Sequence, residues 1–224
     1  MDTPYVYTVI YASPGLWRRV ENTGIRPTEG HSEKGRKRPA STTSPSHTPA
    51  DAPTPGAPYL LRPHRPGDIS WVIARHAALY ADEHGFDTSF EVLVAGIAAD
   101  FIERFDAQRE ACWIAERNSA NLGSVFLVQA RDAATHQPIE GVAQLRMLLV
   151  EPAARGLGLG RRMVEECERF ARRAGYRKIT LWTNANLLAA RGIYGAAGYV
   201  MTSSAPHHSF GHDLMSETWE RVLS

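Results

Sequence analysis

The chain has 224 residues, and its 43% hydrophobic and 22% charged residues are typical of a globular protein that can bury a sizeable core. The 25 Lys and Arg nearly balance the 24 Asp and Glu, so the composition argues against a strongly basic nucleic-acid-binding protein. Two cysteines are too few for a disulfide framework or a cysteine-rich zinc site, which favours a reducing compartment. No apolar run approaches the ~18 residues that span a membrane, and the first residues lack the basic region of a secretory signal. We therefore expect a cytoplasmic protein with no nucleic-acid or membrane partner.

Residues 1–58 differ in composition from the rest of the chain. Between Pro39 and Pro58, 14 of 20 residues are Pro, Ser, Thr or Gly, and large apolar side chains are absent. Such a stretch cannot offset its ordering entropy by burial. A short basic cluster at residues 34–38 fits a solvated charge run better than a targeting or phosphate-binding signal. The composition predicts a disordered, low-complexity N-terminal tail over residues 1–58 and one folded domain over residues 59–224.

From Tyr59 onward, the hydrophobic pattern predicts a domain that contains both helices and strands. A short strand at residues 59–61 precedes a helix for which Asp68 is the expected N-cap. A second helix begins after Thr88 or Ser89, because its apolar residues recur at helical spacing. The later elements are strands 111–116, 123–131 and 139–150, helix 158–174, strand 178–183, helix 187–197, and strands 199–203 and 210–223. Adjacent strands joined by short turns indicate an antiparallel meander, so the fold class is α/β with a mixed sheet.

A glycine-rich turn between a strand and an amphipathic helix is the sharpest motif. The strand ends at Val150, and glycine then occupies every second position at residues 156, 158 and 160, between Arg155 and Arg161. Glycines let the backbone turn sharply and bring N–H groups close to an oxyanion. The new helix adds unpaired N–H groups and its positive dipole end, and the two arginines can add charge-assisted hydrogen bonds. The motif therefore predicts a pyrophosphate site.

Three other interpretations of this turn are possible. A dinucleotide-binding fold would need a third glycine where Arg161 stands and an acidic residue at the end of the next strand, which instead ends in Thr183 and Asn184. A nucleoside triphosphatase would need Lys and then Ser or Thr after the glycines, and the sequence has neither. A connection that binds nothing stays open, although alternate glycines lower helix stability without a binding role.

Two motifs resemble those of the GNAT superfamily of acyl-CoA-dependent N-acetyltransferases. Arg155-x-x-Gly158-x-Gly160 resembles its Q/R-x-x-G-x-G/A signature, and the run from Ala190 through Tyr194 to Gly198-Tyr199 resembles its later A-x-x-x-Y-x-x-x-G-F motif, with Tyr in place of Phe. The resemblance implies the GNAT fold, with a mixed, mostly antiparallel sheet of about six or seven strands and about four helices. Three stretches resemble most the acetyltransferase domain of bacterial proteins that fuse a MarR-type regulator to a GNAT domain: residues 62–68, 112–117 and 206–214. The first 58 residues are too short and too rich in Pro and Ser to form such a regulator.

The resemblance implies that acetyl-CoA is the cosubstrate and that its acetyl group passes directly to an amine, with no covalent enzyme intermediate. The pantetheine arm would enter between the strand ending at Val150 and the strand ending at Thr183. The residues implied to bind the cosubstrate are Leu148, Leu149, Val150, Arg155, Gly156, Leu157, Gly158, Leu159, Gly160, Arg161, Asn184 and Asn186. Tyr194 matches the family's general acid, which protonates the departing thiolate. Residue type alone favours an aromatic that packs against the sheet, and only the motif spacing favours the acid.

The general base and the acceptor site are less defined. No Asp or Glu lies within residues 142–150, so the candidates for the base are a histidine or a water molecule; the histidines are His76, His84, His207 and His208. The residues expected to contact the acceptor are Tyr80, His84, Phe86, His207 and His208, with Tyr80 and Phe86 equally suited to the core. We expect residues 206–211 to form a loop at the rim of the acceptor pocket.

His207, His208, His212 and Asp213 have side chains that suit zinc, but we predict no metal site, because superfamily chemistry requires none. The sequence thus predicts an N-acetyltransferase acting on an unidentified small-molecule, peptide or protein amine. The alternative is a noncatalytic acetyl-CoA-binding regulatory module. Acceptor identity and oligomeric state lie beyond these patterns, because acceptor pockets are built from variable loops.

Overall fold

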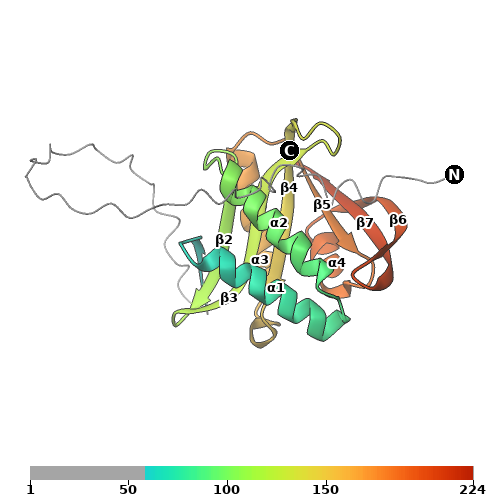
Figure 1. The fold of residues 1–224 in the computed structure, drawn as a ribbon. Helices are drawn as coiled ribbons and strands as arrows, with labels where there is room; N and C mark the ends of the chain where they lie inside the picture. Colours follow the sequence, from blue (N-terminus) through green and yellow to red (C-terminus); the bar gives the residue numbers. More distant parts are fainter. Residues whose placement is uncertain (1–58, 224) are drawn as a thin grey trace, which may run out of the picture.

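The predicted strands assemble into one mixed sheet in the computed structural model, which describes residues 59–223; the predicted N-terminal tail lies outside the described residues. The sheet has seven strands in the order β1-β2-β3-β4-β5-β7-β6 (Figure 1). These are β1 (Leu60–Pro63), β2 (Ala111–Arg117), β3 (Ala120–Arg131), β4 (Pro138–Val150), β5 (Lys178–Asn184), β6 (Val200–Ser209) and β7 (His212–Val222). Within this sheet β4 and β5 are parallel and every other neighbouring pair is antiparallel. The predicted mixed, mostly antiparallel sheet is confirmed.

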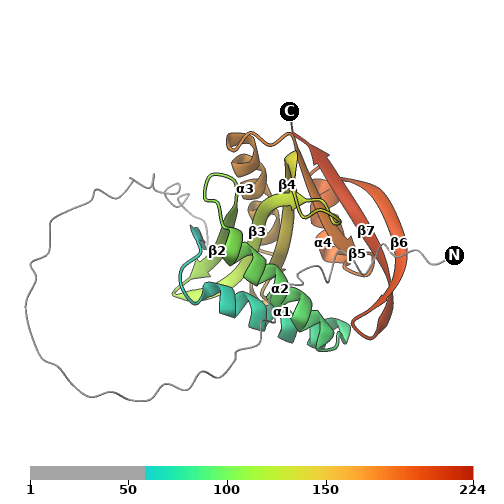
Figure 2. The ribbon, with the colours of Figure 1, turned by 45° about the horizontal axis from the view of Figure 1, so that its top comes forward.

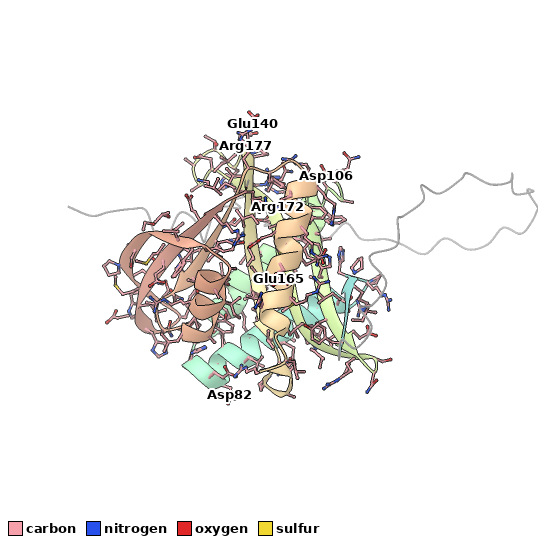
Figure 3. The ribbon with its side chains drawn as sticks, turned by 180° about the vertical axis from the view of Figure 1, so that it is seen from behind. Asp82, Asp106, Glu140, Glu165, Arg172 and Arg177 are labelled. Atoms are coloured by element: carbon pink, nitrogen blue, oxygen red, sulfur yellow. The ribbon has the colours of Figure 1, made fainter. Side chains whose placement is uncertain are left out.

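Helices cover both faces of the sheet. The four α-helices are α1 (Asp68–His84), α2 (Ser89–Arg104), α3 (Leu159–Arg173) and α4 (Leu188–Ala196), and a short 3-10 helix, η1 (Pro152–Ala154), precedes α3. Helices α1 and α2 lie together on one face, beside the part of the sheet formed by β5, β7 and β6 (Figure 2). Helix α3 crosses the opposite face, with Glu165 and Arg172 along it (Figure 3). No helix among residues 59–223 is long and apolar enough to cross a membrane.

The core consists of two clusters, one on each face, because successive residues of a strand point to opposite sides. On β3, Val125 and Leu127 belong to the cluster beneath α3 and α4, whereas Phe126 belongs to the cluster beneath α1 and α2. All three side chains are fully buried. The central strands are therefore buried on both sides, which explains their nearly continuous apolar sequence.

The expectation that Asp68 caps α1 is wrong. Gly67, with a left-handed backbone (φ 95°), is the N-cap residue, and Asp68 is the first residue of the helix. The carboxylate of Asp68 instead accepts hydrogen bonds from Arg62 (2.5 Å) and from the backbone N–H of Arg65 (2.6 Å). Arg62 also donates to Glu116 (2.5 Å), so a largely buried ion network ties β1, α1 and β2 together.

The predicted strand 199–203 and the loop expected at residues 206–211 also need correction. Strand β6 continues to Ser209, which pairs with His212 across a two-residue turn, Phe210 and Gly211. Both turn residues have positive φ (59° and 80°), the backbone that a tight hairpin requires. Pro206 is tolerated within β6 because β6 is the edge strand and has one unpaired side.

Candidate active site

Strands β4 and β5 separate at the centre of the sheet. Their parallel pairing runs from Val142 and Lys178 to Leu145 and Leu181, and no pair follows in the described sheet. Strand β4 carries a bulge just beyond this point, where one intervening residue of β3 faces two of β4. Met147 in the bulge has φ 54°, a strained value for a side chain of this kind, and its carbonyl accepts a hydrogen bond from the buried Ser124 hydroxyl (3.1 Å). The bulge therefore bends β4 away from β5.

A cavity of ≈410 Å³ lies where the two strands separate. Helix α2 lines it with apolar side chains, namely Phe90, Leu93, Val94 and Ile97, and six other elements add further residues. Five of the residues singled out from the sequence are among its walls: His76 and Tyr80 from α1, Leu148 from β4, Asn184 from β5 and Tyr194 from α4. The fold thus brings together candidates for cosubstrate binding, acceptor binding and proton transfer that are far apart in the sequence.

Tyr194 has the properties of a proton donor in this cavity. Its side chain is buried, and its hydroxyl has no hydrogen-bond partner among residues 59–223. Burial raises the pKa of Tyr194 well above its ordinary value, and the nearby Tyr80 acts in the same direction. The hydroxyl therefore keeps its proton at neutral pH and can donate that proton to a bound group.

His76 is the histidine, among the four considered as bases, that lines the cavity. Its buried ring stacks on Tyr80 at 5.9 Å between centroids, and its Nδ1 lies 2.9 Å from the carbonyl oxygen of Val72. Because a carbonyl only accepts, Nδ1 carries the hydrogen, which leaves the Nε2 lone pair available. Burial lowers the pKa of His76 to about 4, so the ring is neutral at pH 7.

The histidines of β6 lie outside the cavity walls. His207 is buried and donates from Nε2 to the side-chain oxygen of Asn184 (3.0 Å), so it supports a residue that lines the cavity. His208 is exposed and bonds Asp213 (2.7 Å), whereas His212 bonds the carbonyl of Gly85 (2.9 Å). Because these histidines have separate partners, they do not converge on one site. Residues 59–223 contain no group of three or more His, Cys, Asp or Glu arranged to hold a metal ion.

Two acceptor candidates of the α1–α2 region contribute to packing. Phe86 is 4% exposed and belongs to an aromatic cluster with Phe90 and Phe210. His84 is half-buried and lies against Tyr80 and Phe86. Neither lines the cavity, so Tyr80 is the member of this group that the structure places in the site.

The glycine turn presents a series of free N–H groups. Within residues 59–223, the backbone N–H groups of residues 156–161 have no hydrogen-bond acceptor, and the first to find one is that of Arg162, on Gly158 (3.0 Å). Gly156 and Gly158 have left-handed backbones (φ 79° and 71°), and a Cβ on either would meet nothing within 4 Å. Backbone conformation, and not crowding, therefore requires glycine here. The free N–H groups belong to the turn and to the first residues of the 15-residue helix α3, an arrangement that binds anions.

The side chains of the residues implied to bind the cosubstrate differ in their surroundings. A Cβ on Gly160 would lie 2.6 Å from the Ile193 side chain, so Gly160 allows α4 to pack closely on α3. Leu159 and Leu149 are buried in the core, Val150 is half-buried, and Leu157 and Asn186 are exposed. Arg161 pairs with Glu165 of its own helix (2.8 Å).

Two ion pairs that the sequence did not indicate join α1 to this turn. Arg155 binds Glu83 (2.6 Å), and Glu151 binds Arg75 through both carboxylate oxygens (2.6 and 2.8 Å). The partners are more than 70 residues apart in the chain, so no local spacing could have revealed them. Helix α1 therefore contacts both the turn and the cavity.

Comparison with known proteins identifies the family. A model of the acetyltransferase (GNAT) family matches residues 74–199, more than half of the chain. Among solved structures, yncA from Salmonella typhimurium with its cofactor acetyl-CoA superposes with a TM-score of 0.60 at 19% identity, covering 75% of this chain and 95% of that one. A ribosomal-protein-alanine N-acetyltransferase from Brucella melitensis gives 0.60 at 17% identity, covering 73% and 99%. An N-acetyltransferase from Staphylococcus aureus Mu50 gives 0.59 at 16% identity, covering 74% and 99%. None of the curated proteins matches this chain. The chain belongs to the GNAT acetyltransferase family, whose cosubstrate is acetyl-CoA.

Proposed function

We propose that this protein transfers the acetyl group of acetyl-CoA to the primary amine of a small molecule by direct attack in a ternary complex. The observation that carries the proposal is one cavity, between the separated strands, lined by both Tyr194 and His76. A volume of ≈410 Å³ suits a small molecule better than a folded protein surface.

The main chain supplies the binding groups for acetyl-CoA. Beyond Leu145, the edge of β4 that faces β5 makes no ladder, so its N–H and carbonyl groups can pair with the amides of a pantetheine arm as an added strand would. The free N–H groups of residues 156–161 fit a pyrophosphate, and the N-terminal end of α3 favours its negative charge. The bound thioester supplies an activated acetyl group.

Tyr194 then acts on the departing sulfur, and His76 acts on the attacking amine. A bond forms between the amine nitrogen and the carbonyl carbon, the carbon–sulfur bond breaks, and Tyr194 donates its hydroxyl proton to the departing sulfur. His76, with a pKa of about 4, holds a proton too weakly to keep it at neutral pH. Its Nε2 therefore orients the amine by accepting a hydrogen bond, and water carries the amine's proton away. A proton from water then restores the Tyr194 hydroxyl.

Replacement of Tyr194 tests the proposal. Tyr194→Phe should lower kcat by about 100-fold or more and leave acetyl-CoA affinity within about twofold, as expected for loss of a general acid. Thiol release measures turnover, and the thermal shift with acetyl-CoA measures binding. Tyr199→Phe is the matched control, because Tyr199 is also buried with an unpartnered hydroxyl among the described residues but does not line the cavity. An unchanged kcat in Tyr194→Phe would contradict the acid role.

A noncatalytic acetyl-CoA-binding module is the second candidate, because no Asp or Glu lines the described cavity and His76 is a weak base. That candidate predicts a thermal shift with acetyl-CoA and no thiol release with any amine.

We also propose that residues 59–224 form the acetyltransferase domain. A second hypothesis is that its sequence is most similar to the acetyltransferase domains that are fused to MarR-type regulators. Two of the stretches that carry this closeness, residues 62–68 and 112–117, contain the Arg62, Asp68 and Glu116 network. The third, residues 206–214, forms the hairpin between β6 and β7. These stretches support the scaffold of the domain.

A further inference from the structure

Arg146 is a cavity residue that the proposed mechanism does not use. It follows Leu145, the last residue of β4 that pairs with β5, and it precedes the bulge at Met147. It lines the cavity where the two strands separate. A guanidinium at the centre of a sheet needs a partner, because burying an unpaired charge costs free energy.

The protein supplies no such partner among residues 59–223. Other half-buried arginines bind carboxylates, as Arg75 binds Glu151 and Arg191 binds Glu217, but Arg146 makes neither a hydrogen bond nor an ion pair within 4.0 Å. Asp100 of α2 acts on its charge only from beyond that distance. Burial lowers the pKa of the Arg146 guanidinium, which is the expected effect of an uncompensated charge.

The remaining walls define what can compensate this charge. They contain no Asp or Glu, and His76 is neutral at pH 7. The face contributed by α2 is apolar, with Phe90, Leu93 and Ile97 among its side chains. The cavity therefore combines one unpaired cation, an apolar wall and neutral hydrogen-bonding groups.

We propose that the acceptor is an amino acid with an apolar side chain, whose carboxylate binds Arg146 while its side chain packs against α2. A guanidinium binds a carboxylate through two parallel hydrogen bonds, which would hold the acceptor in one orientation. Polycationic acceptors such as polyamines are disfavoured, because Arg146 repels them and no acidic residue of the described cavity attracts them. This inference rests on the proposed acetyl transfer.

The turnover test compares leucine, methionine and phenylalanine with their carboxamides, and spermidine is the polycation control. In the full chain with acetyl-CoA, we expect the amino acids to have a KM at least about tenfold below that of the matching amides. Arg146→Gln should remove this preference by raising KM for the amino acids about tenfold more than KM for the amides. Arg104→Gln is the matched control, an exposed arginine on α2 outside the cavity.

A binding test keeps the inference falsifiable if no amine is turned over. With coenzyme A at saturation, N-acetyl-leucine, N-acetyl-methionine and N-acetyl-phenylalanine should raise the unfolding temperature more than their amides do, and Arg146→Gln should abolish the difference. Arg146→Gln must still show the thermal shift with acetyl-CoA alone, which demonstrates that the variant is folded. Discrimination without turnover would support a carboxylate-binding site at Arg146 and defeat the proposed activity, and with it the acceptor role.

Three results would overturn the inference. The first is equal binding of carboxylates and amides by the wild type, and the second is spermidine as the best acceptor. The third is a fall in kcat of equal size for amino acids and amides in Arg146→Gln with KM unchanged. That third pattern would instead assign Arg146 to stabilisation of the oxyanion in the transition state.

Discussion

The glycine turn and the cavity are built in opposite ways. The turn uses main-chain N–H groups of consecutive residues, 156–161, and its side chains are mostly exposed or packed elsewhere. The cavity uses side chains from α1, α2, β4, β5, α4, β6 and β7. A site made of backbone needs a local conformation that short motifs encode, whereas a site made of side chains needs the completed fold.

Helix α1 connects the two regions. Its His76 and Tyr80 line the cavity, and its Arg75 and Glu83 pair with residues at the turn. Because one helix holds both, substitutions on α1 can show whether the turn and the cavity behave as separate sites or as one.

The largest expected effect concerns His76. Its pKa in the folded protein is about 4, below the ordinary value of 6.5, so the unfolded chain binds a proton first as the pH falls. The stabilisation that results is complete above pH 6.5 and is lost as the pH falls toward 4, by about 3 kcal/mol. Urea unfolding at pH 7 and pH 4 should show this loss in the wild type and a smaller loss in His76→Gln.

His208→Gln provides the comparison for that measurement, because His208 is an exposed histidine on β6. It measures how far the loss of a histidine outside the cavity changes stability by itself. An equal loss in the wild type and in His76→Gln would show that His76 is not held neutral by burial, and the tautomer assigned to its ring would lose its support.

The next effect separates the turn from the rest of α3. Gly158 and Gly175 lie at the two ends of this helix, both have left-handed backbones (φ 71° and 77°), and a Cβ on either meets nothing within 4 Å. Alanine at either position should therefore lower the free energy of unfolding by about 1–2 kcal/mol. Calorimetric titration with acetyl-CoA should show a loss of about tenfold in affinity for Gly158→Ala only, because relief of the strain there turns the N–H groups away. Equal affinities in the two variants would reduce the turn to a structural connection.

The smallest effect tests the link between the two regions. Glu83→Gln removes the partner of Arg155 in an exposed ion pair, so stability should change by no more than about 1 kcal/mol. The freed Arg155 can then bind a phosphate, and acetyl-CoA affinity should rise a few fold at low salt. Asp82→Asn, the same change of charge on the adjacent residue at the end of α1 (Figure 3), should have less effect. A loss of affinity in Glu83→Gln would indicate that the ion pair itself shapes the site.

The sequence alone determined the element order, the mixed sheet and the glycine turn. Helical and strand periodicities are local properties, and they place α2 and α3 within a residue of their observed starts. The expectations from the sequence were wrong where a residue distant in the chain makes a contact that overrides a local pattern. Asp68 resembles a helix cap, but the guanidinium of Arg62 binds its carboxylate. Residues 206–211 resemble a loop, but pairing with β7 extends β6 through most of them.

Only the tertiary structure decided which polar side chains share the cavity. The four candidate histidines are equivalent by residue type, but of these four only His76 lines the cavity, where it is buried against Val72 and Tyr80. Arg146 carries no motif and lies in a strand that is otherwise apolar near its end, so its importance appears only when the fold shows that no carboxylate reaches it within the described chain. Backbone conformation is encoded in neighbouring residues, whereas burial and charge pairing depend on contacts between distant ones. For that reason the glycine turn, proposed to bind the cosubstrate, was readable from the sequence, and Arg146, proposed to bind the acceptor, was not.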